Sequence, residues 1–221
     1  EGFEELAAHI KNFSPEKMAP LCGIEADELK TVARKIAGAN AAMIFWGMGI
    51  AQHTHGTDNA RCLIALALLC GQIGRPGAGL HPLRGQNNVQ GASDAGLIPM
   101  MYPDYKQVTN EETRGKFEAY WETDLNPETG LTVVEIVQAI LADEISGMYV
   151  MGENPAMSDP DSNHTREALA KLEHLVVQDI FLTETANYAD VILPASAWPE
   201  KDGTVTNTDR RVQLGRKALE M

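Results

Sequence analysis

The chain has 221 residues, of which 44% are hydrophobic and 22% are charged. This length and composition are typical of a globular protein with a core, in one large domain or two small ones, and exclude a disordered chain. The 31 acidic side chains outnumber the 18 basic ones and leave a net charge of −13, which argues against nucleic acid or an acidic membrane as the main partner. No uninterrupted apolar run of about 18 residues occurs, so no membrane-spanning helix is predicted.

The first part of the chain predicts helices, then one buried strand and one further helix. Ser14 and Pro15 provide a cap and a first-turn proline for the second helix, and Gly38 provides a stop for the third. The predicted elements are helices at 3–11, 14–22 and 27–37, a strand at 41–46 and a helix from about 57 to 69. The apolar side of the last helix is expected in the core, with Leu63, Ile64, Leu66 and Ala67.

The three cysteines, Cys22, Cys62 and Cys70, are odd in number and lie in apolar helical contexts. They are therefore predicted to be reduced, buried thiols. The chain contains no Cys-x-x-Cys, so an iron–sulfur or structural zinc motif is not expected within these residues.

A long irregular stretch follows, from residue 71 to about 105, with a single turn expected around 91–97. A connection of this length favours a functional loop. Within it, Arg84–Gly91 places carboxamides and one guanidinium between glycines. Glycine lets a ligand approach the backbone closely, and these side chains offer planar hydrogen-bonding groups. The stretch is predicted to be a loop that forms a cradle for an anion or polar cofactor; the alternative is an ordinary polar surface loop.

The second part of the chain alternates helices and strands. The pairs Thr109/Glu112 and Thr132/Glu135 match capping boxes, which predict helices running to about Trp121 and Leu141. The following elements are predicted as strand 147–151, helix 162–172, strand 175–178, a helical turn after Thr183, strand 190–193 and a β-rich tail at 204–214.

This alternation predicts an α/β fold with a mostly parallel sheet, in Rossmann-like three-layer α/β/α units. The strand at 41–46 and the strands at 147–193 are far apart in the sequence. We therefore expect parts of two related domains, residues 1–86 and 87–221, joined through the glycine-rich region.

Polar residues follow several predicted strands, where open α/β sheets bind ligands. Gly47-Met48-Gly49 is part of a dinucleotide fingerprint, and its alternative is a tight turn. Met151–Pro155 and Asp179 each follow a strand; Asp179 is either a ligand for a ribose or guanine or the N-cap of the turn near Thr183. His53 and His55 are expected at the surface or behind a site. Glu200–Gln213 is interpreted as a hairpin with its turn at a glycine.

In this order, the stretches resemble the molybdenum/tungsten bis-pterin guanine dinucleotide oxidoreductases, and specifically the catalytic subunit of formate dehydrogenase. The resemblance rests on 46–49, 55–61, 71–77, 81–92, 151–155, 177–186, 189–195 and 200–213. It covers nearly the whole chain.

The resemblance implies two molybdopterin guanine dinucleotides with molybdenum or tungsten between two domains. Asp179 and Thr183 match positions that bind one guanosine end, lined by Gly152, Glu153 and Asn154. Gly47, Met48, Gly49 and Gln52 match the strand-end loop of the other domain, which binds the second dinucleotide. Gln86 matches a residue near the pterin and metal, and Gly85 lies beside it. Arg84 matches the arginine that orients formate in that family. A guanidinium is suited to this role because it holds a carboxylate by paired hydrogen bonds.

Other parts of that family are not matched here: the cysteine or selenocysteine metal ligand with its histidine, the cysteines of the N-terminal 4Fe-4S cluster, and the C-terminal barrel. We therefore interpret the chain as an internal fragment that needs the rest of the polypeptide and does not oxidise formate alone. The resemblance also implies iron–sulfur or diaphorase-type partner subunits. A cytoplasmic location is expected, and a periplasmic one is compatible with a signal before Glu1.

Two alternatives remain open from the sequence. One is another oxidoreductase of the same superfamily, such as a nitrate reductase. The other is a non-catalytic scaffold domain that binds a nucleotide or partner subunits.

Overall fold

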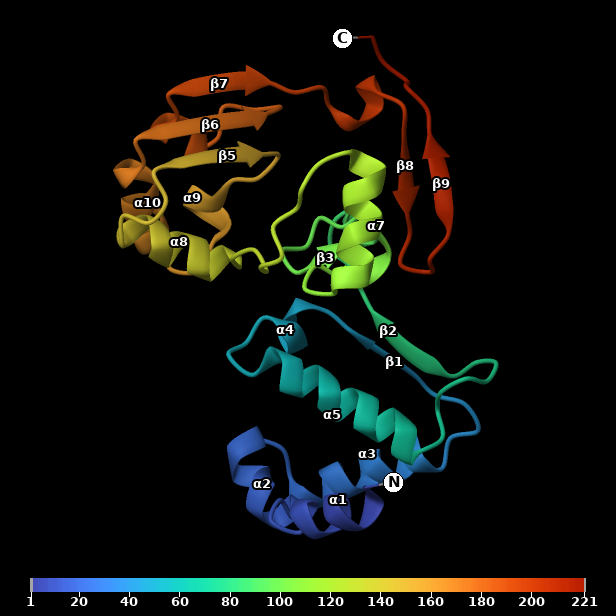
Figure 1. The fold of residues 1–221 in the computed structure, drawn as a ribbon. Coiled ribbons are helices and arrows are strands. Elements are labelled where there is room, and N and C mark those ends of the chain that lie inside the picture. The colour runs from blue at the N-terminus through green and yellow to red at the C-terminus, as the bar shows by residue number, and fades with distance from the viewer. Residues whose placement is uncertain (1, 221) are drawn as a thin grey trace. The chain divides into compact units, whose positions relative to one another are not determined.

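The structure is a computed structural model that describes residues 2–220. The chain divides into two compact units, Glu1–Gly85 and Gln86–Met221 (Figure 1). The division falls inside the polar stretch Arg84–Gly91, so Arg84 and Gly85 belong to the first unit, and Gln86 begins the second.

The first unit consists of helices and two parallel strands. Its elements are α1 (Phe3–Ile10), α2 (Pro15–Cys22), α3 (Ala26–Ala37), β1 (Met43–Trp46), α4 (Met48–Ala51), α5 (Gly56–Leu69) and β2 (Gly79–Pro82). Strand β2 pairs in parallel with β1, and Pro82 lies opposite Trp46. The prediction that 71–105 is irregular was wrong here. A four-residue strand bounded by glycine and proline carries the same signals as a turn.

The buried carboxamide of Gln72 ties the two ends of this βαβ unit together. Gln72 is 1% exposed, and its Oε1 accepts hydrogen bonds from the backbone N–H of Ala42 at 2.9 Å and from the Arg75 guanidinium at 2.8 Å. Its Nε2 donates to the carbonyl of Ala39 at 3.1 Å. The side chain thus connects the segment that enters β1 with the segment that leaves α5.

Much of the apolar surface of the first unit is open. Of the four residues expected in the core of α5, only Ala67 is buried, and Ile64 is 38% exposed. The three cysteines are free, as predicted, but Cys22 and Cys62 are exposed, so the prediction that they are buried was wrong. The reason is that α2 and α5 each leave part of their surface unpacked within this chain.

The second unit begins with short elements and continues as a βα alternation. Its elements are α6 (Val89–Asp94), β3 (Met101–Tyr102), η1 (Pro103–Tyr105), β4 (Lys106–Gln107), α7 (Glu111–Trp121), α8 (Val133–Leu141), β5 (Gly147–Met151), α9 (Pro155–Ser158), α10 (Ser162–Lys171), β6 (His174–Asp179), η2 (Thr185–Tyr188), β7 (Val191–Pro194), η3 (Trp198–Glu200), β8 (Gly203–Thr206) and β9 (Val212–Gly215).

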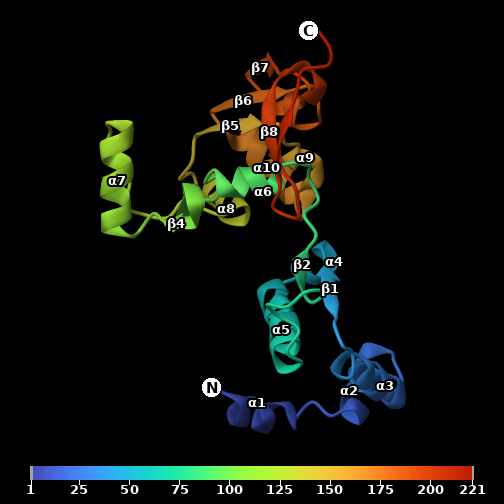
Figure 2. The same ribbon diagram turned by 90° about the vertical axis from the view of Figure 1, so that its right-hand side faces the viewer.

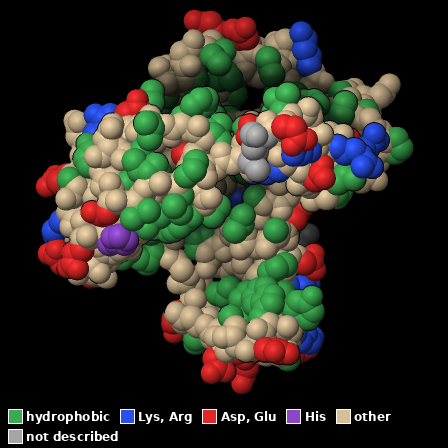
Figure 3. Space-filling model, turned by 90° about the horizontal axis from the view of Figure 1, so that it is seen from above, with side chains coloured by type: hydrophobic (Ala, Val, Ile, Leu, Met, Phe, Trp, Pro, Cys, Tyr) green, Lys and Arg blue, Asp and Glu red, His purple; other side chains and the backbone are tan. Residues whose placement is uncertain are grey.

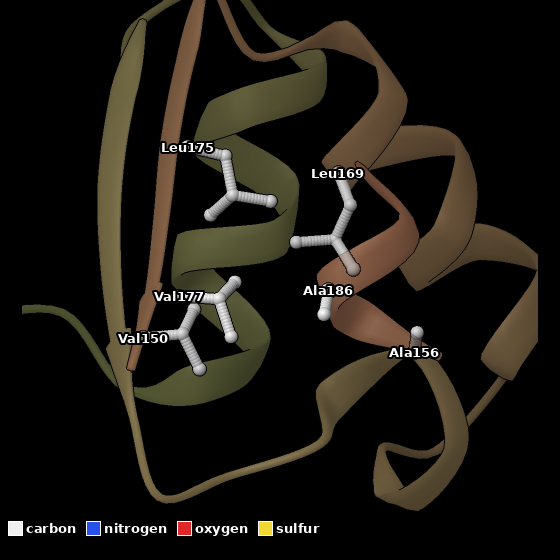
Figure 4. Close-up of a cluster of buried hydrophobic side chains, with 6 residues drawn as sticks. All are labelled: Val150, Ala156, Leu169, Leu175, Val177 and Ala186. Carbon is white, nitrogen blue, oxygen red and sulfur yellow. The ribbon is translucent and has the colours of Figure 1, made fainter. Parts of the chain in front are cut away.

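Strands β5, β6 and β7 form a parallel sheet in that order, and helices α8, α9 and α10 lie on one of its faces (Figure 1). On this face Val150, Leu175 and Val177 pack with residues of the helical side, Ala156, Leu169 and Ala186 (Figure 4). On the other face Tyr149 and Met151 are 50% and 67% exposed. The predicted parallel α/β class is confirmed. Within residues 2–220, helices cover one face of this sheet.

Helix caps and turns account for the remaining boundaries. The capping box at Thr132 is confirmed, because the Glu135 carboxylate accepts from the Thr132 backbone N–H at 2.7 Å. The box at Thr109 was wrong: Asn110 caps α7 and accepts from the Thr113 N–H at 2.9 Å. Asparagine is at least as good an N-cap as threonine, so the cap moves by one residue.

Two predicted boundaries near α6 and the C-terminal hairpin were also wrong. Val89 to Gly91 belong to α6, so the polar loop is shorter than expected. Gly203 begins β8, and the hairpin turns at 207–211, where Arg210 has a φ of 65°. The hairpin lies beside α6 (Figure 2), and Asn88 Oδ1 accepts from the Thr206 N–H at 2.9 Å.

Figure 3 shows hydrophobic side chains at the surface in several separate patches, between charged and other polar groups. Among the described residues, exposed apolar side chains include Phe3, Leu21, Leu97, Phe181 and Leu182. Over residues 2–220, no helix combines the length and the hydropathy that crossing a membrane requires.

Candidate functional site

In the first unit, the carboxyl ends of β1 and β2 bring two predicted stretches to one edge. The backbone N–H of Leu83 donates to the carbonyl oxygen of Trp46 at 2.7 Å. Gly47 and Arg84 therefore follow directly at the same edge. Ligands bind at this edge in parallel α/β sheets.

Only Gly47 separates the end of β1 from a short helix, α4. Met48 and Gly49 belong to the single turn α4 rather than to a loop, which corrects the sequence prediction. Gln52 follows α4 and donates its backbone N–H to the Met48 carbonyl at 2.8 Å. A side chain at Gly49 would meet nothing within 4 Å, so the space there is open to a ligand.

The close approach of α4 and α5 fixes this turn. A Cβ on Gly56 would lie 1.8 Å from the Ala51 carbonyl oxygen, so only glycine fits there. Asn59 Nδ2 donates to the Ile50 carbonyl at 3.0 Å, and His53 Nε2 lies 2.7 Å from the Gly49 carbonyl oxygen. His53 and His55 are exposed. Within residues 2–220, His, Cys, Asp and Glu do not gather in groups of three or more that could hold a metal ion.

Arg84 is exposed at the end of β2. Among the hydrogen bonds and ion pairs of residues 2–220, none engages its guanidinium. A Cβ on the neighbouring Gly85 would meet nothing within 4 Å. The five N–H donors of Arg84 are thus available to a planar anion. Gln86, the first residue of the second unit, is also exposed.

In the second unit, the carboxyl edge of β5 and β6 brings the other two stretches together. Gly152 follows β5 and donates its backbone N–H to the Gln178 carbonyl at 2.9 Å. It has a φ of 66°, a conformation that favours glycine, and a Cβ there would meet nothing within 4 Å. Asp179 is the last residue of β6. The backbone of Gly152 and the carboxylate of Asp179 therefore belong to one edge.

The two oxygens of the Asp179 carboxylate differ in their hydrogen bonding. Oδ1 accepts from the backbone N–H groups of Ile180 at 2.6 Å and Phe181 at 3.4 Å. The cap of η2 is Glu184 instead, so the alternative that Asp179 caps this turn was wrong. Asp179 closes its own loop with one oxygen, and Oδ2 receives no hydrogen bond from residues 2–220. That oxygen is available to a donor on a ligand.

Asn154 and Thr183 use their side chains within the protein. Asn154 Oδ1 accepts from Thr185, and its Nδ2 donates to the Glu184 carboxylate at 2.7 Å. This hydrogen bond lowers the pKa of Glu184. Thr183 Oγ1 accepts from the Ala186 N–H at 3.4 Å. Thr185 and Glu184 are functional candidates that were not predicted individually from the sequence. The sequence signal that could have found them is that Glu184 and Thr185 are two adjacent polar residues directly after the loop that follows β6.

Glu153 is exposed and lines a pocket of about 410 Å³ between α8, β5 and α10. The lining is mostly apolar and includes Ile140, Val150 and Leu169, with Asp159 as its second carboxylate. Burial raises the pKa of the Asp159 carboxyl group. Glu153 is therefore an exposed residue in the lining of an apolar pocket, directly after Gly152 at the strand edge.

A family model described as molybdopterin oxidoreductase matches residues 5–221. The F420-dependent formate dehydrogenase subunit alpha of Methanocaldococcus jannaschii is 51% identical over 219 residues, which cover 99% of this chain and 32% of that protein. Formate dehydrogenase H of Escherichia coli is 42% identical over 221 residues, covering 100% of this chain and 31% of that protein. The chain thus spans about a third of the length of these relatives.

Among solved structures, acetylene hydratase from Pelobacter acetylenicus superposes with a TM-score of 0.72 over 99% of this chain and 33% of its own. Its sequence identity is 17%. At this identity the likeness shows a shared fold and nothing about the reaction.

Proposed function

This chain belongs to the molybdopterin oxidoreductase family, and we propose that it is part of the catalytic subunit of a formate dehydrogenase. The observation that carries the proposal is the free guanidinium of Arg84 at the carboxyl edge of β1 and β2. Relatives named as formate dehydrogenases align with the chain over nearly its full length. The reaction proposed for the whole protein is the two-electron oxidation of formate to carbon dioxide.

The family implies a molybdopterin cofactor that holds molybdenum or tungsten, and the residues present fit such a group. Two parallel sheets end in open, glycine-containing edges, at Gly47–Gly49 and at Gly152. When bound, the cofactor supplies the redox chemistry and takes up the two electrons of the substrate.

We extend the proposal to the guanine dinucleotide form of the cofactor. The Oδ2 of Asp179 is an acceptor of the kind that the N1–H and amino group of guanine require. The Gly152 backbone beside it leaves room for the nucleotide, and Thr183 and Glu153 lie on the adjoining segments. Two such dinucleotides, one on each unit, are proposed for the whole enzyme.

The proposed role of Arg84 is to bind and orient formate. A guanidinium forms two parallel charge-assisted hydrogen bonds to a carboxylate, which fixes the carboxylate plane and the direction of the C–H bond. Oxidation of formate releases two electrons and one proton and leaves neutral carbon dioxide. Arg84 therefore discriminates between the bound substrate and the uncharged product.

The electrons must leave through groups outside this chain. Its three cysteines contain no Cys-x-x-Cys pair, and two of them are exposed on helices α2 and α5. We propose that a 4Fe-4S cluster elsewhere in the polypeptide and iron–sulfur or diaphorase-type subunits carry the electrons onward.

The test uses the full-length protein and the variants Arg84→Ala and Arg84→Lys. We expect kcat/KM for formate to fall at least about a hundredfold for Arg84→Ala, with a smaller fall for Arg84→Lys, because lysine keeps the charge and loses the paired geometry. Metal and pterin contents should stay unchanged. The matched control is Arg61→Ala, which removes another exposed arginine of the same unit, one that pairs with Asp58 at 3.0 Å.

Full formate turnover by Arg84→Ala would refute the role of Arg84. An assay of the unaltered protein with nitrate, run in parallel, addresses the nitrate reductase alternative. Turnover of nitrate without turnover of formate would replace the proposed substrate.

A further inference from the structure

Two loops at the carboxyl edge of β5 and β6 are joined by a partly buried hydrogen-bond network. Thr185, in η2, has 0% exposure. Its backbone N–H and its Oγ1 donate to Asn154 Oδ1, at 3.1 Å and 2.8 Å. The same Oγ1 accepts from the Ala156 N–H at 3.1 Å. The Thr185 hydroxyl is thus used both as a donor and as an acceptor.

The network continues on either side of this pair. The Arg166 Nε donates to the carbonyl of Ala156 at 2.8 Å, and Asn154 Nδ2 donates to the Glu184 carboxylate at 2.7 Å. Figure 4 shows Ala156 of α9 and Ala186 of η2 on the helical side of the same buried cluster. The Thr185–Ala156 part of the network therefore lies on the packed side of the unit, between the turn after β5 and the turn after β6. The network ends in the exposed Glu184.

The loop between Asp179 and Thr185 has little other packing. Its central residues Ile180, Phe181 and Leu182 are 50%, 73% and 81% exposed. One end of the loop is fixed by β6, and the other end is held by the bonds of Thr185 to Asn154. A loop with few buried contacts opens locally unless its ends are anchored. The position of Asp179 and Thr183 relative to Gly152 therefore depends on this anchor.

We propose that Thr185 and Asn154 are positioning residues, which set the affinity for a guanosine nucleotide by fixing the 179–185 loop against the end of β5. This inference rests on the proposed function of that edge. Asn154 Oδ1 already accepts two donors, which is the capacity of a carbonyl oxygen. Thr185 is fully buried. Both residues act on a ligand through the geometry of the loop.

The experiment measures the binding of guanosine 5′-monophosphate to full-length, cofactor-free protein by calorimetry. Thr185→Val keeps the shape of the side chain but leaves the Ala156 N–H without its acceptor, and it removes one donor to Asn154. We expect about tenfold weaker binding, which corresponds to about 1.4 kcal/mol, because a buried donor that loses its partner destabilises the loop geometry. Thr185→Ser restores the hydroxyl and should bind nearly as well as the unaltered protein.

The matched control is Thr165→Val, which makes the same chemical change at another buried threonine of the unit, in α10 and 2% exposed. Thr165 lines the apolar pocket and is not one of the residues that join the two loops. An effect of placing valine at a buried threonine in itself would appear in both variants. A positioning role affects nucleotide binding only in Thr185→Val.

A second set of variants tests the link to Glu184 without emptying a buried site. Asn154→Asp places two carboxylates at hydrogen-bonding distance, so binding should weaken. Adding Glu184→Gln supplies a new donor that faces Asp, and the double variant should recover most of the lost affinity. Such recovery is a coupling that two independent structural defects would not produce.

Weaker binding by Thr185→Val, with recovery in Thr185→Ser and in the double variant, supports the inference. If the unaltered protein binds the nucleotide and Thr185→Val and Asn154→Asp bind it equally well, the inference is wrong and the proposed function stands. If the unaltered protein does not bind the nucleotide, the proposed guanosine site itself is wrong, and the inference falls with it.

Discussion

The backbone N–H of Leu83 donates a 2.7 Å hydrogen bond to the carbonyl oxygen of Trp46. This bond belongs to the last pair of the parallel ladder between β1 and β2, Trp46 and Pro82, because in such a ladder the residue after one partner donates to the carbonyl of the other. The bond fixes the backbone position of Leu83 and therefore of the next residue, Arg84. The backbone pairing of β1 and β2 therefore places Arg84 at the same sheet edge as Gly47.

Replacing Leu83 by proline tests this relationship, because proline lacks the N–H. We expect kcat/KM for formate in the full-length enzyme to fall about tenfold or more, since loss of one hydrogen bond costs about 1 kcal/mol and the displacement of Arg84 adds to it. Leu83→Ala is the control. It keeps the N–H and removes a side chain that is 51% exposed, so its activity should stay within about twofold. Equal activity of the two variants would contradict the prediction.

The elements with a clear period could be predicted from the sequence. The strand and helix alternation from 147 to 193 matches β5 to β7, because a buried parallel strand and an amphipathic helix leave different apolar patterns. The cap at Thr132 could also be predicted, because its partner Glu135 is only three residues away in the sequence. The polar residues after β1, β5 and β6 were also recognisable as strand-end positions.

Contacts between distant residues could not be predicted in this way. Strand β2 depends on its pairing with β1, and its own four residues resemble a turn. The bond between Thr185 and Asn154 joins residues 31 positions apart, and no local pattern marks it. The cysteines were misplaced because apolar neighbours in the sequence indicate a buried helix face only if another element covers that face.

The carboxyl group of Asp159 gives a prediction about pH. Burial raises its pKa above the ordinary value of 3.8, which means that its charged form is less favourable in the folded protein than in the unfolded chain. The folded protein loses stability as the pH rises through the raised pKa. Asp159→Asn should therefore melt at a higher temperature than the unaltered protein at pH 7, and the difference should disappear below about pH 3.8.

Glu135 provides a control of opposite sign for this measurement. Its hydrogen bonds from Thr132 lower its pKa below the ordinary value of 4.5, so its contribution to stability is present above that value and is lost as the pH falls through the lowered pKa. Glu135→Gln should melt at a lower temperature than the unaltered protein at pH 7, and the two should converge in acid. Shifts of the same sign for both variants would contradict the assignment of the two carboxyl groups.

The last prediction concerns the hairpin of β8 and β9, which is anchored to α6 by the bond from the Thr206 N–H to Asn88 Oδ1 at 2.9 Å. A two-stranded hairpin is marginally stable alone, and Thr206 is 9% exposed. We expect Asn88→Ala to speed amide hydrogen exchange at Thr206 about tenfold, because a buried donor loses a partner worth about 1–2 kcal/mol. Asn87→Ala, which changes an exposed neighbour, should leave that exchange unchanged. Unaltered protection of Thr206 in Asn88→Ala would show that strand pairing alone holds the hairpin.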